Sequence, residues 1–104
     1  MKWDSSDERD SRIVDKGRWY NLDEVDEKAP NRSGVYIFVN VDLQVKYVGK
    51  AGAGRLKEEI KNAISRGKDR GATKFGWFAT NSDDKAKSLE RDWIDKYKPS
   101  NNLI

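Results

Sequence analysis

The chain has 104 residues, enough for one domain, and although 38% of them are charged, four Trp, four Tyr and three Phe can fill a small core. It contains no Cys and no His, which excludes a disulfide framework, a thiolate zinc site, a cysteine nucleophile and an imidazole base, so any proton chemistry must use Tyr, Lys, Asp or Glu. Its net charge of +3 is uneven, because residues 1–28 hold six bases and nine acids (net −3) and residues 29–104 hold fifteen bases and nine acids (net +6). The basic part favours a polyanionic partner, although a solvated lysine-rich surface has the same composition.

The first residues are mostly Ser, Asp, Arg and Lys, and we expect residues 1–17 to form a disordered polar leader before a single domain at 18–104. Asn21 and Glu24 are spaced as in an N-terminal capping box, which predicts one short helical turn that stops before Pro30. No apolar run approaches the roughly 20 residues of a membrane span, and the polar N-terminus does not resemble a signal peptide. We therefore expect a soluble, cytoplasmic protein without a membrane partner.

Two β-branched and aromatic segments, 34–40 and 44–48, are separated by a short turn and predict a β-hairpin. Side chains alternate along a strand, so Val35, Ile37 and Val39 share one face. The aromatic side chains of Tyr36 and Phe38 then share the other face.

A glycine-rich loop at 49–54 precedes a segment with helical apolar spacing, 55–67, whose last residue, a glycine, is suited to end a helix. An exposed basic loop at 66–74, a third strand at 74–80 and a helix over 83–98 follow. The predicted fold is α+β, a small three-stranded antiparallel sheet flanked by helices in the order β-β-α-β-α.

Glu90 interrupts the apolar stripe of this last helix, which Leu89, Trp93 and Tyr97 define. A carboxylate that faces a core needs a cation, a base or a hydroxyl as its partner. Two interpretations remain open: a helix rolled so that Glu90 reaches water, or a carboxylate that binds a metal ion.

Several short segments and single residues follow one another in a familiar order: Gly34-Val-Tyr36, then Tyr47-Val-Gly49, then Lys50, Arg55, Glu90 and Asn102. Together they resemble the GIY-YIG nuclease family, and within it the excision-repair type found at the N-terminus of UvrC. The resemblance covers about residues 33–102.

The resemblance implies hydrolysis of DNA phosphodiesters with one divalent cation, Mg²⁺ or Mn²⁺, and a tyrosine as general base. By position, Tyr47 is the implied base and Tyr36 its neighbour in the hydroxyl network, while Glu90 is the implied metal ligand. Arg55 would hold a phosphate, Asn102 would make a supporting polar contact, and the positive charge of Lys50 would help Tyr47 to lose its proton. The hydroxyls of Tyr36 and Tyr47 are expected on the same side of the sheet as the Glu90 carboxylate.

Each of these residues also has a structural interpretation. Strand tyrosines commonly pack across strands, an arginine at a helix start is commonly solvated, and either Asn101 or Asn102 can be the site residue. Two features depart from the family: Arg55 follows Tyr47 after a short interval of eight residues, and Glu59 stands where a Tyr or His is usual.

Two functions therefore remain. The first is a metal-dependent, repair-related endonuclease that acts on duplex or branched DNA, with specificity supplied by a protein partner. The alternative is a catalytically weak or inactive nucleic-acid-binding module of the same fold. In both, DNA phosphates would contact four bases of the basic loop: Arg66, Lys68, Arg70 and Lys74.

Overall fold

The computed structural model describes residues 1–103 and contains five strands, three α-helices and three 3-10 helices. The strands are β1 Ile13–Lys16, β2 Tyr20–Asn21, β3 Gly34–Val39, β4 Val45–Ala51 and β5 Lys74–Thr80. The helices are η1 Ser5–Arg9, η2 Leu22–Glu24, α1 Val25–Lys28, α2 Leu56–Ser65, α3 Asp83–Tyr97 and η3 Ser100–Leu103. None of the helices in the described part is long and apolar enough to cross a membrane.

The sheet is antiparallel throughout, with the order β1-β5-β3-β4, and β2 also pairs with β5. The three predicted strands and their hairpin are confirmed as β3, β4 and β5. The sheet nevertheless has five strands rather than three, because β1 and β2 add to the free edge of β5. This leaves β4 as an edge strand.

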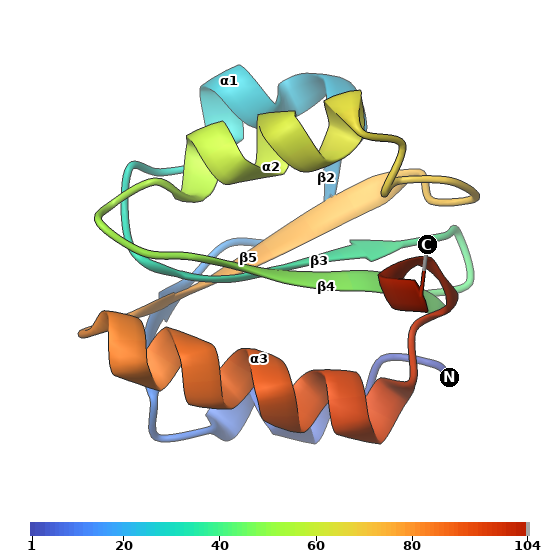
Figure 1. Ribbon diagram of the computed structural model, residues 1–104. Coiled ribbons are helices and arrows are strands. Elements are labelled where there is room, and N and C mark those ends of the chain that lie inside the picture. The colour runs from blue at the N-terminus through green and yellow to red at the C-terminus, as the bar shows by residue number, and fades with distance from the viewer. Residues whose placement is uncertain (104) are drawn as a thin grey trace.

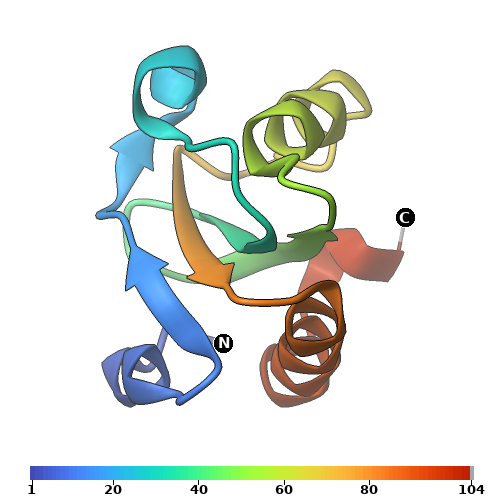
Figure 2. The ribbon, with the colours of Figure 1, turned by 90° about the vertical axis from the view of Figure 1, so that its left-hand side faces the viewer.

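Helices cover both faces of the sheet, as Figures 1 and 2 show: α1 and α2 lie on one face, and α3 and η1 on the other. The predicted alternation of β3 divides its side chains between two cores. Val35, Ile37 and Val39 pack against Leu89 and Trp93 of α3. On the opposite face the aromatic side chains of β3 pack against α2, in a core that contains Tyr36, Phe38, Leu56 and Ile60.

The N-terminal segment is ordered, so the expectation of a disordered leader at 1–17 is wrong. The Trp3 side chain is only 8% exposed and stacks on Tyr97 at 5.3 Å between ring centroids, in the α3-face core. Lys96 of α3 forms ion pairs with Asp4 (3.0 Å) and Asp7 (2.9 Å). One buried indole and a set of ion pairs across to α3 therefore order a segment whose composition is otherwise that of a disordered chain.

Local signals at the helix ends are confirmed. Ser82 caps α3 by accepting a hydrogen bond from the Lys85 N–H. Gly67 follows α2 with φ +76°, a left-handed conformation that suits glycine. Glu24 accepts a hydrogen bond from the Asn21 N–H at 2.8 Å, as in the predicted capping box.

Candidate active site

Tyr36 and Tyr47 form a pair of phenols on the α2 face, with ring centroids 6.1 Å apart. Tyr36 lies on β3 directly opposite Gly49 of β4 in the strand register. A Cβ atom at Gly49 would lie 2.3 Å from Cζ of Tyr36, so only glycine lets this ring extend over β4 toward its free edge. The glycine of the Tyr47-Val-Gly49 segment thus places the buried phenol beside the half-buried one.

Burial is the main influence on both phenols and raises the pKa of Tyr36 and of Tyr47 above the usual value of 10.0. The positive charge of Arg66 opposes this and lowers the pKa of both, and a hydrogen bond from Tyr36 also lowers that of Tyr47. Arg66, at the C-terminal end of α2, is therefore a source of positive charge near Tyr47 that the sequence did not lead us to expect.

A pocket of about 290 Å³ lies beside the end of β4 and the loop that follows it. Its lining includes Lys50, Arg55, Glu59 and Asp83. Asp83, in the first turn of α3, accepts a hydrogen bond from the Ala53 N–H at 3.2 Å. The hydroxyl of Ser33 accepts one from the Gly54 N–H at 3.0 Å. These two contacts fix the loop that precedes Arg55, and no sequence pattern predicted either Asp83 or Ser33 in this role.

Arg55 is already paired with a residue of α2, the helix that follows it. Its guanidinium contacts both carboxylate oxygens of Glu58, with Nε–Oε2 at 3.0 Å and an Nη2–Oε1 distance of 2.8 Å. Glu59 lies farther from the same group, at 3.6 Å. The fork that would bind a phosphate is therefore occupied by a carboxylate, which the phosphate has to displace.

Glu90 is half-buried on α3 and has neither a hydrogen bond nor an ion pair with any other residue in the range 1–103. Burial raises the pKa of Glu90, and the charge of Lys50 partly opposes the increase. Lys50 lies opposite Val35 in the register, so its side chain leaves β4 on the α3 face. Lys50 and Glu90 therefore belong together on this face of the sheet.

The two phenols and Glu90 do not share one side of the sheet, contrary to expectation. The phenols pack with α2, whereas α3 covers the opposite face. The charge of Glu90 nevertheless raises the pKa of Tyr47, so the two groups interact around β4. Because β4 is an edge strand, the site extends over both of its faces.

The two asparagines near the C-terminus have different partners. Asn102 pairs with the backbone of Val48, accepting from its N–H at 2.9 Å and donating to its C=O at 2.8 Å. Asn101 is buried and donates to the carbonyls of Lys68 and Arg70, both at 2.8 Å. Asn102 therefore supports the strand residue next to Tyr47, and Asn101 holds the basic loop.

The predicted basic residues do not form one exposed loop. Arg66 and Arg70 are exposed, whereas Lys68 and Lys74 are partly buried. The ammonium of Lys74 lies at the start of β5 and donates to Oδ1 of Asn21 at 3.0 Å. The charge of Arg66 lowers the pKa of both phenols.

The residues of this site fit a hard divalent cation that is held by a single protein ligand, the carboxylate of Glu90. No group of three or more Asp and Glu residues in the range 1–103 is arranged to hold a metal ion, so a closed cage of protein ligands is absent from that range. Mg²⁺ commonly binds through one or two carboxylates and completes its shell with water and phosphate oxygens. The unpartnered, half-buried carboxylate of Glu90 fits this mode.

Comparison with protein families gives one match over most of the chain, to the family described as a domain of unknown function (DUF7508), over residues 14–96. Among curated proteins, UvrABC system protein C of Mycoplasma capricolum is 30% identical over 91 residues, 81% of this chain. The corresponding protein of Rickettsia rickettsii is 36% identical over 83 residues, 73% of this chain. The aligned parts are 15% and 13% of those proteins, so the chain corresponds to a small part of each.

Solved structures are similar as well. The GIY-YIG N-terminal endonuclease domain of UvrC from Thermotoga maritima, bound to its catalytic divalent cation, magnesium, superposes with a TM-score of 0.65 at 26% identity. The match covers 76% of this chain and 91% of that domain. A point mutant of the same domain, also bound to its catalytic divalent cation, superposes with a TM-score of 0.61 at 28% identity. This match covers 70% of this chain and 84% of the mutant domain.

Proposed function

The chain belongs to the DUF7508 family and has the fold of the GIY-YIG endonuclease domain, and from this premise we propose that it is a divalent-metal-dependent endonuclease that hydrolyses phosphodiester bonds in DNA. The observation that carries the proposal is the carboxylate of Glu90, half-buried and unpartnered within residues 1–103, whose charge acts on the phenol of Tyr47. A structural carboxylate in this position would have an ion-pair partner.

We assign Glu90 as the ligand of Mg²⁺ or Mn²⁺, which would supply positive charge to stabilise the leaving oxygen. Arg55 would exchange Glu58 for a non-bridging phosphate oxygen pair of the DNA. Lys50 adds positive charge on the same face as Glu90.

In the proposed hydrolysis Tyr47 acts as a phenolate, which the positive charge of Arg66 stabilises. The phenolate oxygen accepts a proton from the attacking water and becomes a neutral phenol. Tyr36 donates its hydrogen bond to that phenolate oxygen. Asn102 is a positioning residue, because it holds the backbone of Val48 beside Tyr47. We assign Arg66, Lys68 and Arg70 to contacts with the phosphates of the DNA backbone. The proposed substrate is a repair-related DNA, and a protein partner would supply the specificity for it.

A second candidate is a DNA-binding module without turnover, and one observation favours it. The guanidinium of Arg55 is held by Glu58 and approached by Glu59, so phosphate must compete with two carboxylates for it. This arrangement weakens the phosphate contact on which turnover depends.

Cleavage of a panel of duplex, flap and branched DNAs with Mg²⁺ or Mn²⁺ tests the proposal. We expect cleavage by the native chain and its loss in Glu90→Gln, with DNA affinity without metal equal or slightly higher. Glu27→Gln is the matched control, since Glu27 is exposed on α1 and unpartnered in the described chain. Binding without cleavage by the native chain would favour the second candidate, and cleavage by Glu90→Gln would overturn the metal-ligand assignment.

A further inference from the structure

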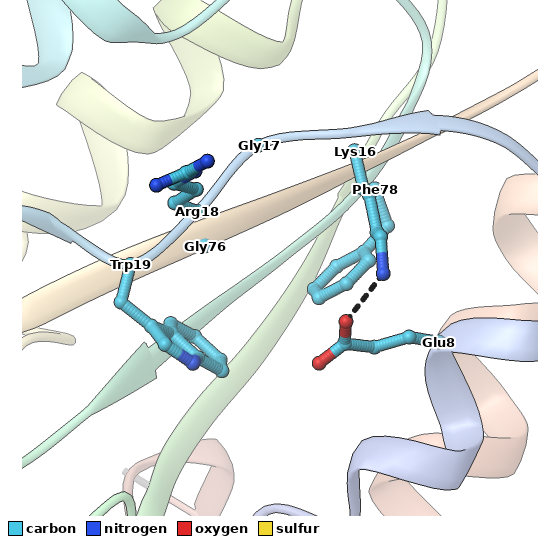
Figure 3. A pocket seen from close by; sticks show the side chains of 7 residues that line it. All are labelled: Glu8, Lys16, Gly17, Arg18, Trp19, Gly76 and Phe78. Carbon is cyan, nitrogen blue, oxygen red and sulfur yellow. Dashed lines mark hydrogen bonds and ion pairs between the residues drawn. The ribbon is translucent and has the colours of Figure 1, made fainter.

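A second pocket, of about 350 Å³, lies at the opposite edge of the sheet from β4. It is bounded by η1, by the connection between β1 and β2, and by β5. Figure 3 shows the ring of Trp19, the ring of Phe78 and the Glu8–Lys16 pair around one space. None of these groups belongs to the site around Glu90.

The aromatic wall depends on a glycine. Trp19 lies against Gly76 of β5, where a Cβ atom would be 2.6 Å from the indole ring. Edge-to-face contacts with Trp3 at 5.8 Å and Phe78 at 6.4 Å fix the indole further. Trp3, Trp77 and Trp93 are each at most 8% exposed, so Trp19 is the tryptophan most open to solvent.

The polar part of the pocket offers both an acceptor and donors. Burial alone would raise the pKa of Glu8, but hydrogen bonds from Lys16 and Trp3 hold it below its usual value, so the carboxylate is ionised. The guanidinium of Arg18 is exposed, and the described structure gives it no partner. The indole N–H of Trp19 likewise has no acceptor within residues 1–103.

We propose that this pocket binds an unstacked nucleobase together with its phosphate, the base lying against Trp19 and Phe78 and the phosphate on Arg18. A flat heteroaromatic ring matches the rigid aromatic wall, and its amino and carbonyl groups can pair with Glu8 and the Trp19 N–H. An aliphatic or phenyl guest would leave the Trp19 N–H without a partner and would offer no donor to the remaining lone pairs of Glu8. Bases inside a duplex are stacked and paired, so the pocket selects single-stranded or unpaired nucleotides.

This site is independent of the proposed hydrolysis. Its residues come from the N-terminal segment and from β5, and no cation is needed for the binding. Binding measured in EDTA therefore tests the pocket alone, and the outcome does not depend on whether the chain cleaves DNA.

Trp19 is a built-in reporter of the pocket. We expect a single-stranded mixed-sequence decamer, added in EDTA, to quench tryptophan fluorescence with saturation, and the matching duplex to quench it much less. Trp19→Phe removes the saturable signal. We expect Arg18→Gln to lower the affinity for the decamer about tenfold, because one charge-assisted contact is lost. Arg9→Gln is the matched control, because Arg9 is an exposed arginine of η1 without a partner in the described residues.

Three results would overturn the proposal: equal quenching by duplex and decamer, a saturable signal that persists in Trp19→Phe, or equal losses of affinity in Arg18→Gln and Arg9→Gln. Arg18 is exposed, so its substitution tests the pocket even if Trp19→Phe fails to fold. Adenosine monophosphate distinguishes the source of the ligand. If adenosine monophosphate binds with the same affinity as the decamer, the pocket is a site for free nucleotides. If it binds much more weakly, the pocket is a site for a base within a strand.

Discussion

At the scale of single residues, the candidate site depends on small side chains as much as on reactive ones. The ring of Tyr36 reaches toward the edge of the sheet because Gly49 leaves room for it. Arg55 is the opposite case, since its reactive group is present but held by Glu58. Both features concern access to a reactive group rather than its presence in the chain.

Gly49→Ala would place a methyl group in the volume of the Tyr36 ring. We expect a loss of about 1–3 kcal/mol in the free energy of unfolding, as for other overpacked cores. Chemical denaturation measures the loss, and a double-mutant cycle with Tyr36→Ala isolates its cause. Additive effects of the two substitutions would show that the clash with Tyr36 is not responsible.

Glu58→Gln would free the guanidinium of Arg55 from its closest carboxylate. We expect a DNA affinity about two- to fivefold higher and a free energy of unfolding changed by less than about 0.5 kcal/mol, because the pair is exposed. Fluorescence anisotropy with a labelled duplex measures the affinity. Glu27→Gln makes the same change in net charge at an exposed residue that has no ion pair with Arg55 in the described chain, and an equal gain in affinity there would show that net charge alone is responsible.

At the scale of elements, periodicity predicted the three central strands, the two long helices and the division of β3 between two cores. It could not predict that the site extends over both faces of β4, because the path of α3 across the sheet depends on tertiary packing. Asn102 shows the same limit: its pairing with Val48 joins residues that no local pattern relates.

Asn102→Ala would leave the edge backbone of Val48 without its side-chain partner. We expect faster hydrogen exchange at the Val48 amide and a loss of about 1–2 kcal/mol in the free energy of unfolding. Asn101→Ala is the neighbouring control, since it releases the carbonyls of Lys68 and Arg70 instead. Exchange measured by NMR should separate the two variants, and unchanged protection of Val48 in Asn102→Ala would contradict the pairing.

At the scale of the whole molecule, the N-terminal segment connects parts that the sequence suggests are separate. It adds β1 to the sheet, packs Trp3 in the α3-face core and forms ion pairs with α3. The composition of the segment did not predict this, because its order depends on a few specific contacts. These are the burial of Trp3 and the ion pairs of Asp4 and Asp7 with Lys96. The same segment builds the second pocket, so folding and the proposed base site depend on the same residues.

The carboxylates of this segment make the stability of the fold depend on pH at the acidic end. Hydrogen bonds from Ser6 and then from Lys96 lower the pKa of Asp4 from 3.8 to about 2. A carboxyl group whose pKa is lower in the folded state stabilises that state fully above its unfolded pKa, and the effect is lost as the pH falls through the folded value. We therefore expect the melting temperature to fall between about pH 4 and pH 2, and less steeply in Asp4→Asn.

Asp42→Asn is the control, because Asp42 is an exposed turn residue with no ion pair in the described chain. Thermal melting followed by near-ultraviolet circular dichroism of the tryptophans gives the comparison. Identical acid profiles for the native chain and Asp4→Asn would show that the contact between the N-terminal segment and α3 does not depend on this carboxylate.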